Sequence, residues 1–199
     1  MAGETLVPPG RVLVVGLGNP GSRYDRTRHN IGFDVVEELC RRWSIPVTEK
    51  KFKGLLGLGV IGGRPASVLL PQTFMNLSGE SVGPAMGFWR LTPASVIVCH
   101  DDIDLQPGQV RLKLGGGHGG HNGLRSMDQH LPSKDYFRIR LGVGRPPLAT
   151  MDVAAWVLAR FGADEASAVD RLVTTGADAV ERLLREGLQA TQNAIHPLS

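Results

Sequence analysis

The chain has 199 residues, of which 42% are apolar, so it is long and apolar enough to bury one sizeable core. Its net charge of +3 is unevenly spread, because residues 1–145 hold 18 Lys and Arg against 12 Asp and Glu, whereas residues 146–199 hold 4 against 7. This basic excess favours a polyanion partner such as nucleic acid, although an unevenly charged, solvated surface is the commoner cause.

Two features bear on where the protein works. The opening MAGETLVPPG lacks the apolar segment of a signal peptide, and no run approaches the roughly 18 apolar residues of a membrane span. Cys40 and Cys99 each lie inside an apolar stretch without metal-type spacing, which is typical of buried free thiols in a reducing compartment. We therefore expect a cytoplasmic protein that does not bind membranes.

Strands and helices alternate in the first half of the chain. RVLVVGLG (11–18) is a short apolar run closed by glycine, typical of a strand buried on both faces. After the polar loop SRYDRTRHN, apolar residues recur at helical spacing from Ile31 to Trp43, and Asn30 is placed to cap that helix. KGLLGLGVIGGRPASVLLP (53–71) predicts a hairpin of two strands, and residues 80–90 follow as a helix.

The second half continues the alternation. SVIVCHDD, QVRLKLG and FRIRLGVG are predicted strands, and HNGLRSMDQHL is a predicted helix. The tail contains an amphipathic helix that Asp164 is placed to cap. We expect one α/β domain over residues 1–199, with a twisted, mostly parallel mixed sheet flanked by helices and a flexible extension at residues 1–10.

Ligands of such sheets bind beyond the carboxyl ends of the strands, so the turns after residues 17, 99, 114 and 143 should converge. Residues 146–163 are predicted to form a mobile flap beside this crevice. The turn GLGNPG fits the GxGxxG pattern of dinucleotide-binding enzymes, but it does not lead straight into a helix. The acids at the expected distance, Glu37 and Glu38, lie on the helix itself. We therefore expect no dinucleotide cofactor and a turn that presents Asn19.

Four polar stretches stand out in this frame: NPGSRYDRTRHN (19–30), TFMNLSG (73–79), CHDDID (99–104) and LGGGHGGHNG (114–123). Together with their flanks they closely resemble the bacterial-type peptidyl-tRNA hydrolases, in order and over almost the whole chain. The resemblance implies hydrolysis of the ester that joins a peptide to the terminal ribose of tRNA, which releases the tRNA for reuse in translation.

Ester hydrolysis at neutral pH needs a base that activates water and donors for the charge that develops on the carbonyl oxygen. His29 can be that base, and a carboxylate on its other ring nitrogen would fix the tautomer and raise its basicity. Asp101 directly follows a buried strand and suits that role. The resemblance implies that His29 and Asp101 are the catalytic pair.

Three asparagines in glycine-rich or strand-end loops can donate to an oxyanion without adding charge. By resemblance, Asn19 positions His29 and the ester, Asn76 steadies the developing charge, and Asn122 contacts water and the peptide backbone. Three further residues are assigned to substrate binding in the same way: Tyr24, Met75 and His121.

Lys113 and Arg140 lie at predicted strand ends, and the resemblance implies that they bind tRNA phosphate. Other cations could widen this patch and give salt-sensitive binding with little base readout: Arg23, Arg26, Arg28, Lys50, Lys51, Lys53, Arg111, Arg125 and Arg138. The expected partner is therefore peptidyl-tRNA, bound by a monomer.

Two alternatives stay open. One is a non-catalytic RNA-binding protein on the same scaffold, which would need the basic face but not the base. The other is a metal-dependent esterase with His118 and His121 near the aspartates of HDDID, although an HxxH among glycines does not set ligands on one rigid element. Nucleophilic catalysis is disfavoured because Ser22, Ser78 and Ser81 lack a nucleophile elbow. We expect no metal and no cofactor.

Overall fold

The structure is a computed structural model and describes residues 3–196. A single seven-stranded sheet runs through it in the order β2-β3-β4-β1-β5-β7-β6. The strands are β1 (Val12–Gly16), β2 (Glu49–Lys51), β3 (Gly54–Ile61), β4 (Arg64–Pro71), β5 (Val96–Asp102), β6 (Val110–Leu114) and β7 (Phe137–Gly142). The four central strands, β4, β1, β5 and β7, are parallel, and the three outer pairings are antiparallel. The predicted α/β class and mixed sheet with a parallel centre are confirmed.

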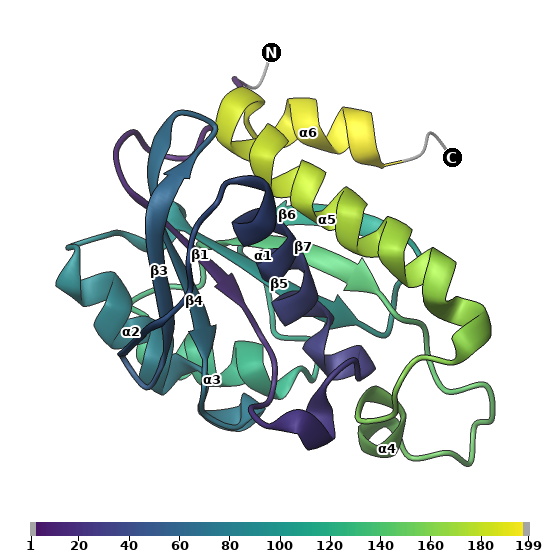
Figure 1. Cartoon of the computed structure of the whole chain (residues 1–199). Coiled ribbons are helices and arrows are strands. Elements are labelled where there is room, and N and C mark those ends of the chain that lie inside the picture. The colour runs from purple at the N-terminus through teal and green to yellow at the C-terminus, as the bar shows by residue number, and fades with distance from the viewer. Residues whose placement is uncertain (1–2, 197–199) are drawn as a thin grey trace.

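Helices cover both faces of this sheet (Figure 1). On one face α1 (Ile31–Arg42) packs against α5 (Ala166–Glu186), and α6 (Leu188–Ile195) packs on α5 and β6. On the other face lie α2 (Gly79–Phe88) and α3 (Asn122–His130), which contact each other. The short α4 (Val153–Val157) stands apart from both layers, beside the turn that precedes α1.

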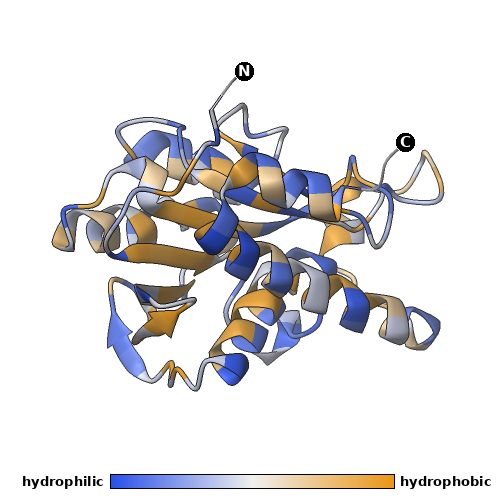
Figure 2. Cartoon of the chain, turned by 90° about the horizontal axis from the view of Figure 1, so that it is seen from above, coloured by the Kyte–Doolittle hydropathy of each residue, from blue (hydrophilic) through white to orange (hydrophobic). Residues whose placement is uncertain are grey.

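The two faces have separate apolar cores, as expected for strands that are apolar on both sides. All five residues of β1 are buried, and alternate side chains from it enter the core under α1 and α5 and the core under α2 and α3. Figure 2 shows the consequence, with largely hydrophobic strands beneath helices that alternate hydrophobic and hydrophilic residues. Cys40 and Cys99 are buried free thiols, as predicted.

A close backbone contact places the first turn of α1 on the sheet. A Cβ on Gly32 would meet the carbonyl oxygens of Leu17 and Cys99, and a Cβ on Gly16 would meet the Gly32 backbone. Because neither glycine has a side chain, α1 lies directly on the ends of β1 and β5. This contact brings residues 28–30, just before α1, next to the end of β5.

Two local predictions need correction, and one strand was not predicted. Asn30 occupies the N-cap position of α1, but its side chain does not cap the helix, because it is bonded to Asn19 instead. Asp164 does not cap α5, since it lies in a 3₁₀ turn, Ala163–Glu165, and the N-cap position of α5 falls on Glu165. The edge strand β2 is absent from the sequence-based expectation, because EKK carries no apolar pattern.

The turn after residue 114 does not start at the crevice, contrary to the prediction. β6 runs antiparallel to β7, so Leu114 pairs with Phe137 at the opposite end of the sheet from Asp101. The glycine-rich segment that follows, residues 115–121, then runs back to the crevice. The predicted convergence is thus reached by a long return loop and not by the strand end itself.

Both ends of the described chain lie near α6. In the segment predicted to be a flexible extension, the amide of Leu188 donates to the Thr5 carbonyl and the amide of Thr5 donates to the Gln189 side chain, while Val7 is buried. Residues 1 and 2 fall outside the described range, and the flexibility of residues 1–10 stays a prediction. Within residues 3–196, no helix combines the length and apolarity needed to span a bilayer.

Candidate active site

A cavity of about 670 Å³ opens at the carboxyl edge of β1 and β5. Segments that are distant in sequence form its wall: the loop between β1 and α1, residues 74–76, the end of β5, side chains of β6 and β7, the returning glycine loop with the start of α3, and α4. Most of the predicted catalytic and binding residues line it: Asn19, His29, Met75, Asn76, Asp101, Lys113, His121, Asn122 and Arg140.

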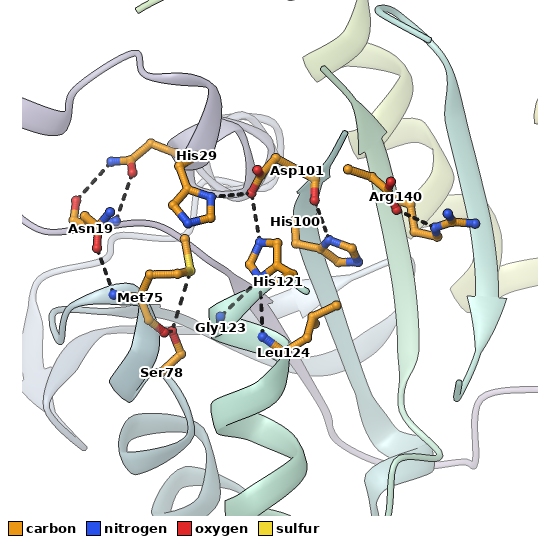
Figure 3. A network of polar contacts seen from close by, with 12 residues as sticks. Asn19, His29, Met75, Ser78, His100, Asp101, His121, Gly123, Leu124 and Arg140 are labelled. Carbon is orange, nitrogen blue, oxygen red and sulfur yellow. Dashed lines mark hydrogen bonds and ion pairs between the residues drawn. The ribbon is translucent and has the colours of Figure 1, made fainter. Parts of the chain in front are cut away.

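The centre of the cavity wall is a carboxylate shared by two imidazoles (Figure 3). Asp101 Oδ1 lies 2.8 Å from His29 Nδ1 and 2.9 Å from His121 Nε2. The Asp101 side chain is 2% exposed, so a carboxylate here needs both partners to remain ionised. The predicted pair of residues 29 and 101 is therefore in direct contact, and His121 joins it.

Backbone contacts fix which ring nitrogens carry protons. The Nδ1 atom of His121 accepts hydrogen bonds from the amides of Gly123 and Leu124, so it caps α3 and must be unprotonated. His121 Nε2 therefore bears the proton and donates to Asp101. His29 likewise donates from Nδ1 to Asp101, which leaves its Nε2 lone pair free to accept a proton.

These contacts shift the pKa values in opposite directions. Burial alone would lower the pKa of His29, but the Asp101 charge and the hydrogen bond outweigh it and raise the pKa above 6.5. Burial alone would raise the pKa of Asp101, yet the two imidazoles hold it well below its usual range. At neutral pH Asp101 is therefore ionised, and its charge makes His29 a stronger base, which suits general-base catalysis.

A third histidine lies behind the pair, and the motifs do not point to it. His100 donates from Nδ1 to the carbonyl oxygen of Asp101 at 2.7 Å, and its ring packs edge-on against His121 with centroids 5.1 Å apart. Burial, with the nearby His121 as a smaller cause, lowers the pKa of His100 to about 3, so it stays neutral. The only sequence signal for His100 is its position beside Asp101.

Asn19 organises the opposite side of the cavity. Its Oδ1 accepts the amide of Met75 at 2.8 Å, while the Asn30 side chain accepts from the Asn19 amide and donates to the Asn19 carbonyl. With Oδ1 occupied, the side-chain nitrogen of Asn19, Nδ2, is left as a donor. No hydrogen bond joins Asn19 to His29 within residues 3–196, so the structure ties Asn19 to the Met75 turn and not to the base.

Comparisons with known proteins point to one family. The sequence model of the peptidyl-tRNA hydrolase family matches residues 13–199. The chain is 51% identical to the peptidyl-tRNA hydrolase of Mycobacteroides abscessus over 93% of this chain and 94% of that one. It is 46% identical to that of Geobacillus kaustophilus over 87% and 92% of the two chains. The crystal structure of peptidyl-tRNA hydrolase from Acinetobacter baumannii superposes with a TM-score of 0.88 at 38% identity, covering 99% of both chains.

The chain belongs to the peptidyl-tRNA hydrolase family. The resemblance drawn from the four motifs is thereby confirmed. It extends over the α4 segment and both C-terminal helices, which the motifs do not cover.

The remaining residues assigned to substrate from the hydrolase motifs differ in their exposure. Asn76 and Asn122 are exposed and line the cavity, whereas Met75 is buried at its floor. Tyr24 does not line the cavity. Its ring packs edge-on against Phe74, and Phe74 does line the cavity. Tyr24 thus lies at the rim.

The basic residues of this hydrolase separate into two groups. Lys113 and Arg140 line the cavity, and the Arg140 Nε donates to Asp102 at 2.8 Å. Burial, together with the nearby Arg138 and Arg140, lowers the pKa of Lys113.

Two predicted members of the cationic patch are buried and cannot face solvent. Arg138 donates to the carbonyls of Gly116 and Gly117 and so holds the glycine loop. Arg28 pairs with Glu165. Both must be removed from the predicted phosphate-binding surface.

The spacing of the His29, Asp101 and His121 donor atoms, all within 4.8 Å of one another, would also suit a metal ion. The hydrogen bonds of these three residues do not suit a metal ion. Each imidazole points an N–H, and not a lone pair, at Asp101, and the other nitrogen of His121 already accepts two backbone amides. A metal ion would require His121 to release the α3 cap, so this donor set fits proton transfer better than metal binding.

Proposed function

We propose that the chain hydrolyses the ester between a peptide and the terminal ribose of tRNA, with His29 as general base. The observation that carries the proposal is the 2.8 Å contact of His29 Nδ1 with a buried, ionised Asp101, which leaves Nε2 free at the cavity. Membership of the peptidyl-tRNA hydrolase family supplies the substrate class.

In the first step, Nε2 of His29 accepts a proton from water while the water oxygen bonds to the ester carbonyl carbon. Asp101 stabilises the imidazolium that forms, and the assistance is worth about 10² to 10⁴ in rate. The tetrahedral intermediate then collapses. The carbon–oxygen bond to the ribose breaks, and the ribose oxygen takes the proton back from Nε2.

Neutral side-chain amides stabilise the negative charge that develops on the carbonyl oxygen. The Nδ2 group of Asn19 is held by the Met75 contact, and Asn76 in the next turn brings a second amide to the same cavity. Donors fixed before the reaction need no reorganisation as charge develops. Asn122, at the start of α3, flanks the other side and suits contacts to the peptide backbone and water, whereas both ring nitrogens of His121 are already engaged by α3 and Asp101.

Lys113 and Arg140 would bind phosphate where β6 and β7 line the cavity, and the exposed Arg125 lines the same cavity. Because His29, Asp101 and the asparagines come from one chain, we expect a monomer to be active. The two buried thiols, Cys40 and Cys99, support a reducing compartment such as the cytoplasm.

The test is deacylation of N-acetyl-aminoacyl-tRNA, with the unblocked aminoacyl-tRNA as control. We expect hydrolysis of the blocked substrate, its persistence after exhaustive EDTA treatment, and its loss in His29→Ala with tRNA affinity retained. Absence of hydrolysis by the unmutated protein would instead support a non-catalytic RNA-binding protein, and loss with EDTA would support a metal-dependent esterase.

A further inference from the structure

The wall of the cavity opposite the sheet is the short helix α4. Three residues of α4, Val153, Ala154 and Val157, line the same cavity as His29, and so does Leu158, which directly follows the helix. Val153 and Leu158 are 39% and 41% exposed, which is high for large apolar side chains. α4 therefore adds an apolar surface to the cavity that His29 and Asp101 also line.

A buried arginine, Arg28, makes several side-chain contacts to the segment that carries this wall. The guanidinium carbon of Arg28 lies 3.6 Å from the ring centroid of Trp156 in α4. Its Nη1 donates to the Arg160 carbonyl at 2.9 Å, and its Nη2 donates to both carboxylate oxygens of Glu165 at 3.1 and 2.8 Å. The Trp156 indole in turn donates to the Gly144 carbonyl at 2.8 Å, which fixes the ring from its other side.

Backbone contacts join the same two segments. The amide of Arg28 donates to the Ala159 carbonyl at 3.1 Å, and Thr27 pairs with Arg160 in an isolated antiparallel bridge. Arg28 directly precedes His29 in one 3₁₀ turn, so the turn that carries the base is fastened to the segment that carries α4. Figure 1 shows this segment beside the purple turn that leads into α1.

Arg28 is suited to this contact by its planar group. Its side chain is 5% exposed, so the charge needs Glu165 and the carbonyls as partners. Stacking on an indole and donating to two carboxylate oxygens together require a flat, multiply donating cation, which lysine cannot replace. Glu165 is held in turn, because its other contact is the amide of Gly162.

We propose that Arg28 is a positioning residue for the peptide part of the substrate: it holds the apolar face of α4 at a fixed place across from His29, where that face contacts the first residues of the bound peptide. The inference rests on the proposed function for the identity of the ligand, but the contact between Arg28 and α4 does not. Arg28 does not touch the reacting atoms, so its effect should appear in binding of the peptide and not in proton transfer.

The kinetic test compares two substrates that carry the same tRNA, an N-acetyl-aminoacyl-tRNA and a tripeptidyl-tRNA. In Arg28→Lys, we expect KM for the tripeptidyl substrate to rise about fivefold, the size expected when a few apolar contacts are loosened. KM for the N-acetyl substrate and the pH midpoint of kcat should stay unchanged. The matched control is Arg171→Lys, the same exchange at an exposed arginine of α5 whose guanidinium bonds to Ser167 within that helix.

A drop in kcat that is equal for both substrates, with KM unchanged, would overturn the proposal, because Arg28 would then act on His29 or on folding. Glu165→Gln provides a second route if Arg28→Lys fails to fold. It keeps the shape of the acceptor but removes its charge, and it should raise the same KM in the same direction.

Amide hydrogen exchange tests the contact without any activity. Residues 153–161 should exchange about tenfold faster in Arg28→Lys than in the parent, while β5 is unchanged and the control Arg171→Lys matches the parent. Equal exchange in the variant and the parent would refute the role of Arg28 in holding α4. If the parent hydrolyses neither substrate, the proposed function fails, and the exchange result still decides whether Arg28 fastens the wall.

Discussion

His121 donates a 2.9 Å hydrogen bond from Nε2 to Oδ1 of Asp101, the same carboxylate oxygen that accepts a hydrogen bond from His29. The carboxylate is thus held from two sides, by the base and by the residue that caps α3. Movement of α3 or of its glycine loop would change the position of Asp101 and hence the orientation of His29. This relationship gives His121 a part in the site that differs from substrate contact alone.

His121→Ala removes two interactions at once. It deprives Asp101 of one donor and α3 of its N-cap, and we expect a loss of stability of about 1–3 kcal/mol with activity reduced about tenfold. His121→Asn is the matched variant, since asparagine caps helices well but is too short to reach Asp101. In His121→Asn the free energy of unfolding, measured with urea, should return toward that of the parent, whereas the activity should stay low. Full recovery of activity would show that only the cap matters.

The pH dependence of kcat/KM reports on His29. Because the pKa of His29 lies above 6.5, activity should fall as pH drops through that raised value. In Asp101→Asn the charge that raises the pKa is removed, while the amide oxygen can still accept a weaker hydrogen bond from His29, so the midpoint should move to lower pH, and the plateau rate should fall about 10²- to 10⁴-fold. Initial rates measured from acid to neutral pH check both points. A midpoint that stays in place would remove Asp101 from its assigned role.

His100 makes the fold sensitive to acid. Its pKa in the folded protein is about 3, against 6.5 when unfolded, so the unfolded chain binds the proton first and stability falls as pH decreases from 6.5 toward 3. At about pH 5 this loss amounts to about 2 kcal/mol. In His100→Asn, whose amide can still donate to the Asp101 carbonyl, we expect the difference in unfolding free energy between pH 7 and pH 5 to shrink by that amount. Identical differences in both proteins would contradict it.

Arg140 and Lys113 should affect tRNA binding through charge. Replacing either by glutamine is expected to raise KM and to reduce the slope of log affinity against log salt by about 0.7–0.9 for each phosphate that the variant no longer neutralises. Asp102→Asn is the converse variant, because it releases Arg140 from its 2.8 Å ion pair and should strengthen binding at low salt. Affinity for deacylated tRNA at several salt concentrations measures these effects. An unchanged slope in Arg140→Gln would exclude binding of phosphate by this residue.

The parts of the fold that rest on local pattern could be predicted from the sequence. The apolar run of β1, the helical spacing of α1 and α5 and the β3–β4 hairpin are all evident there, because each element buries a face that its own residues define. The contact of His29 with Asp101 follows from the motifs. The direction of β6 does not, since the long glycine loop after it permits either orientation.

Residues whose partners are remote in sequence could not be assigned. Arg28 looks like a surface cation in the sequence, yet its partner Glu165 lies 137 positions away. Asn30 is expected to cap its own helix, and only the folded chain shows that it bonds to Asn19. A propensity rule considers near neighbours, whereas buried polar groups take whichever partner the tertiary structure supplies.

Gly16 and Gly32, where α1 rests on the strand ends, limit which substitutions the active site can tolerate. The distance between the imidazole and its carboxylate is set there by main chain against main chain, with no side chain whose rotamer could take up an error. A methyl group at either position would displace α1, so we expect alanine scanning to find these two glycines as sensitive in catalysis as the charged residues themselves. Attempts to redesign the specificity of this scaffold are better directed at α4 and the cavity rim, where changes leave that spacing intact.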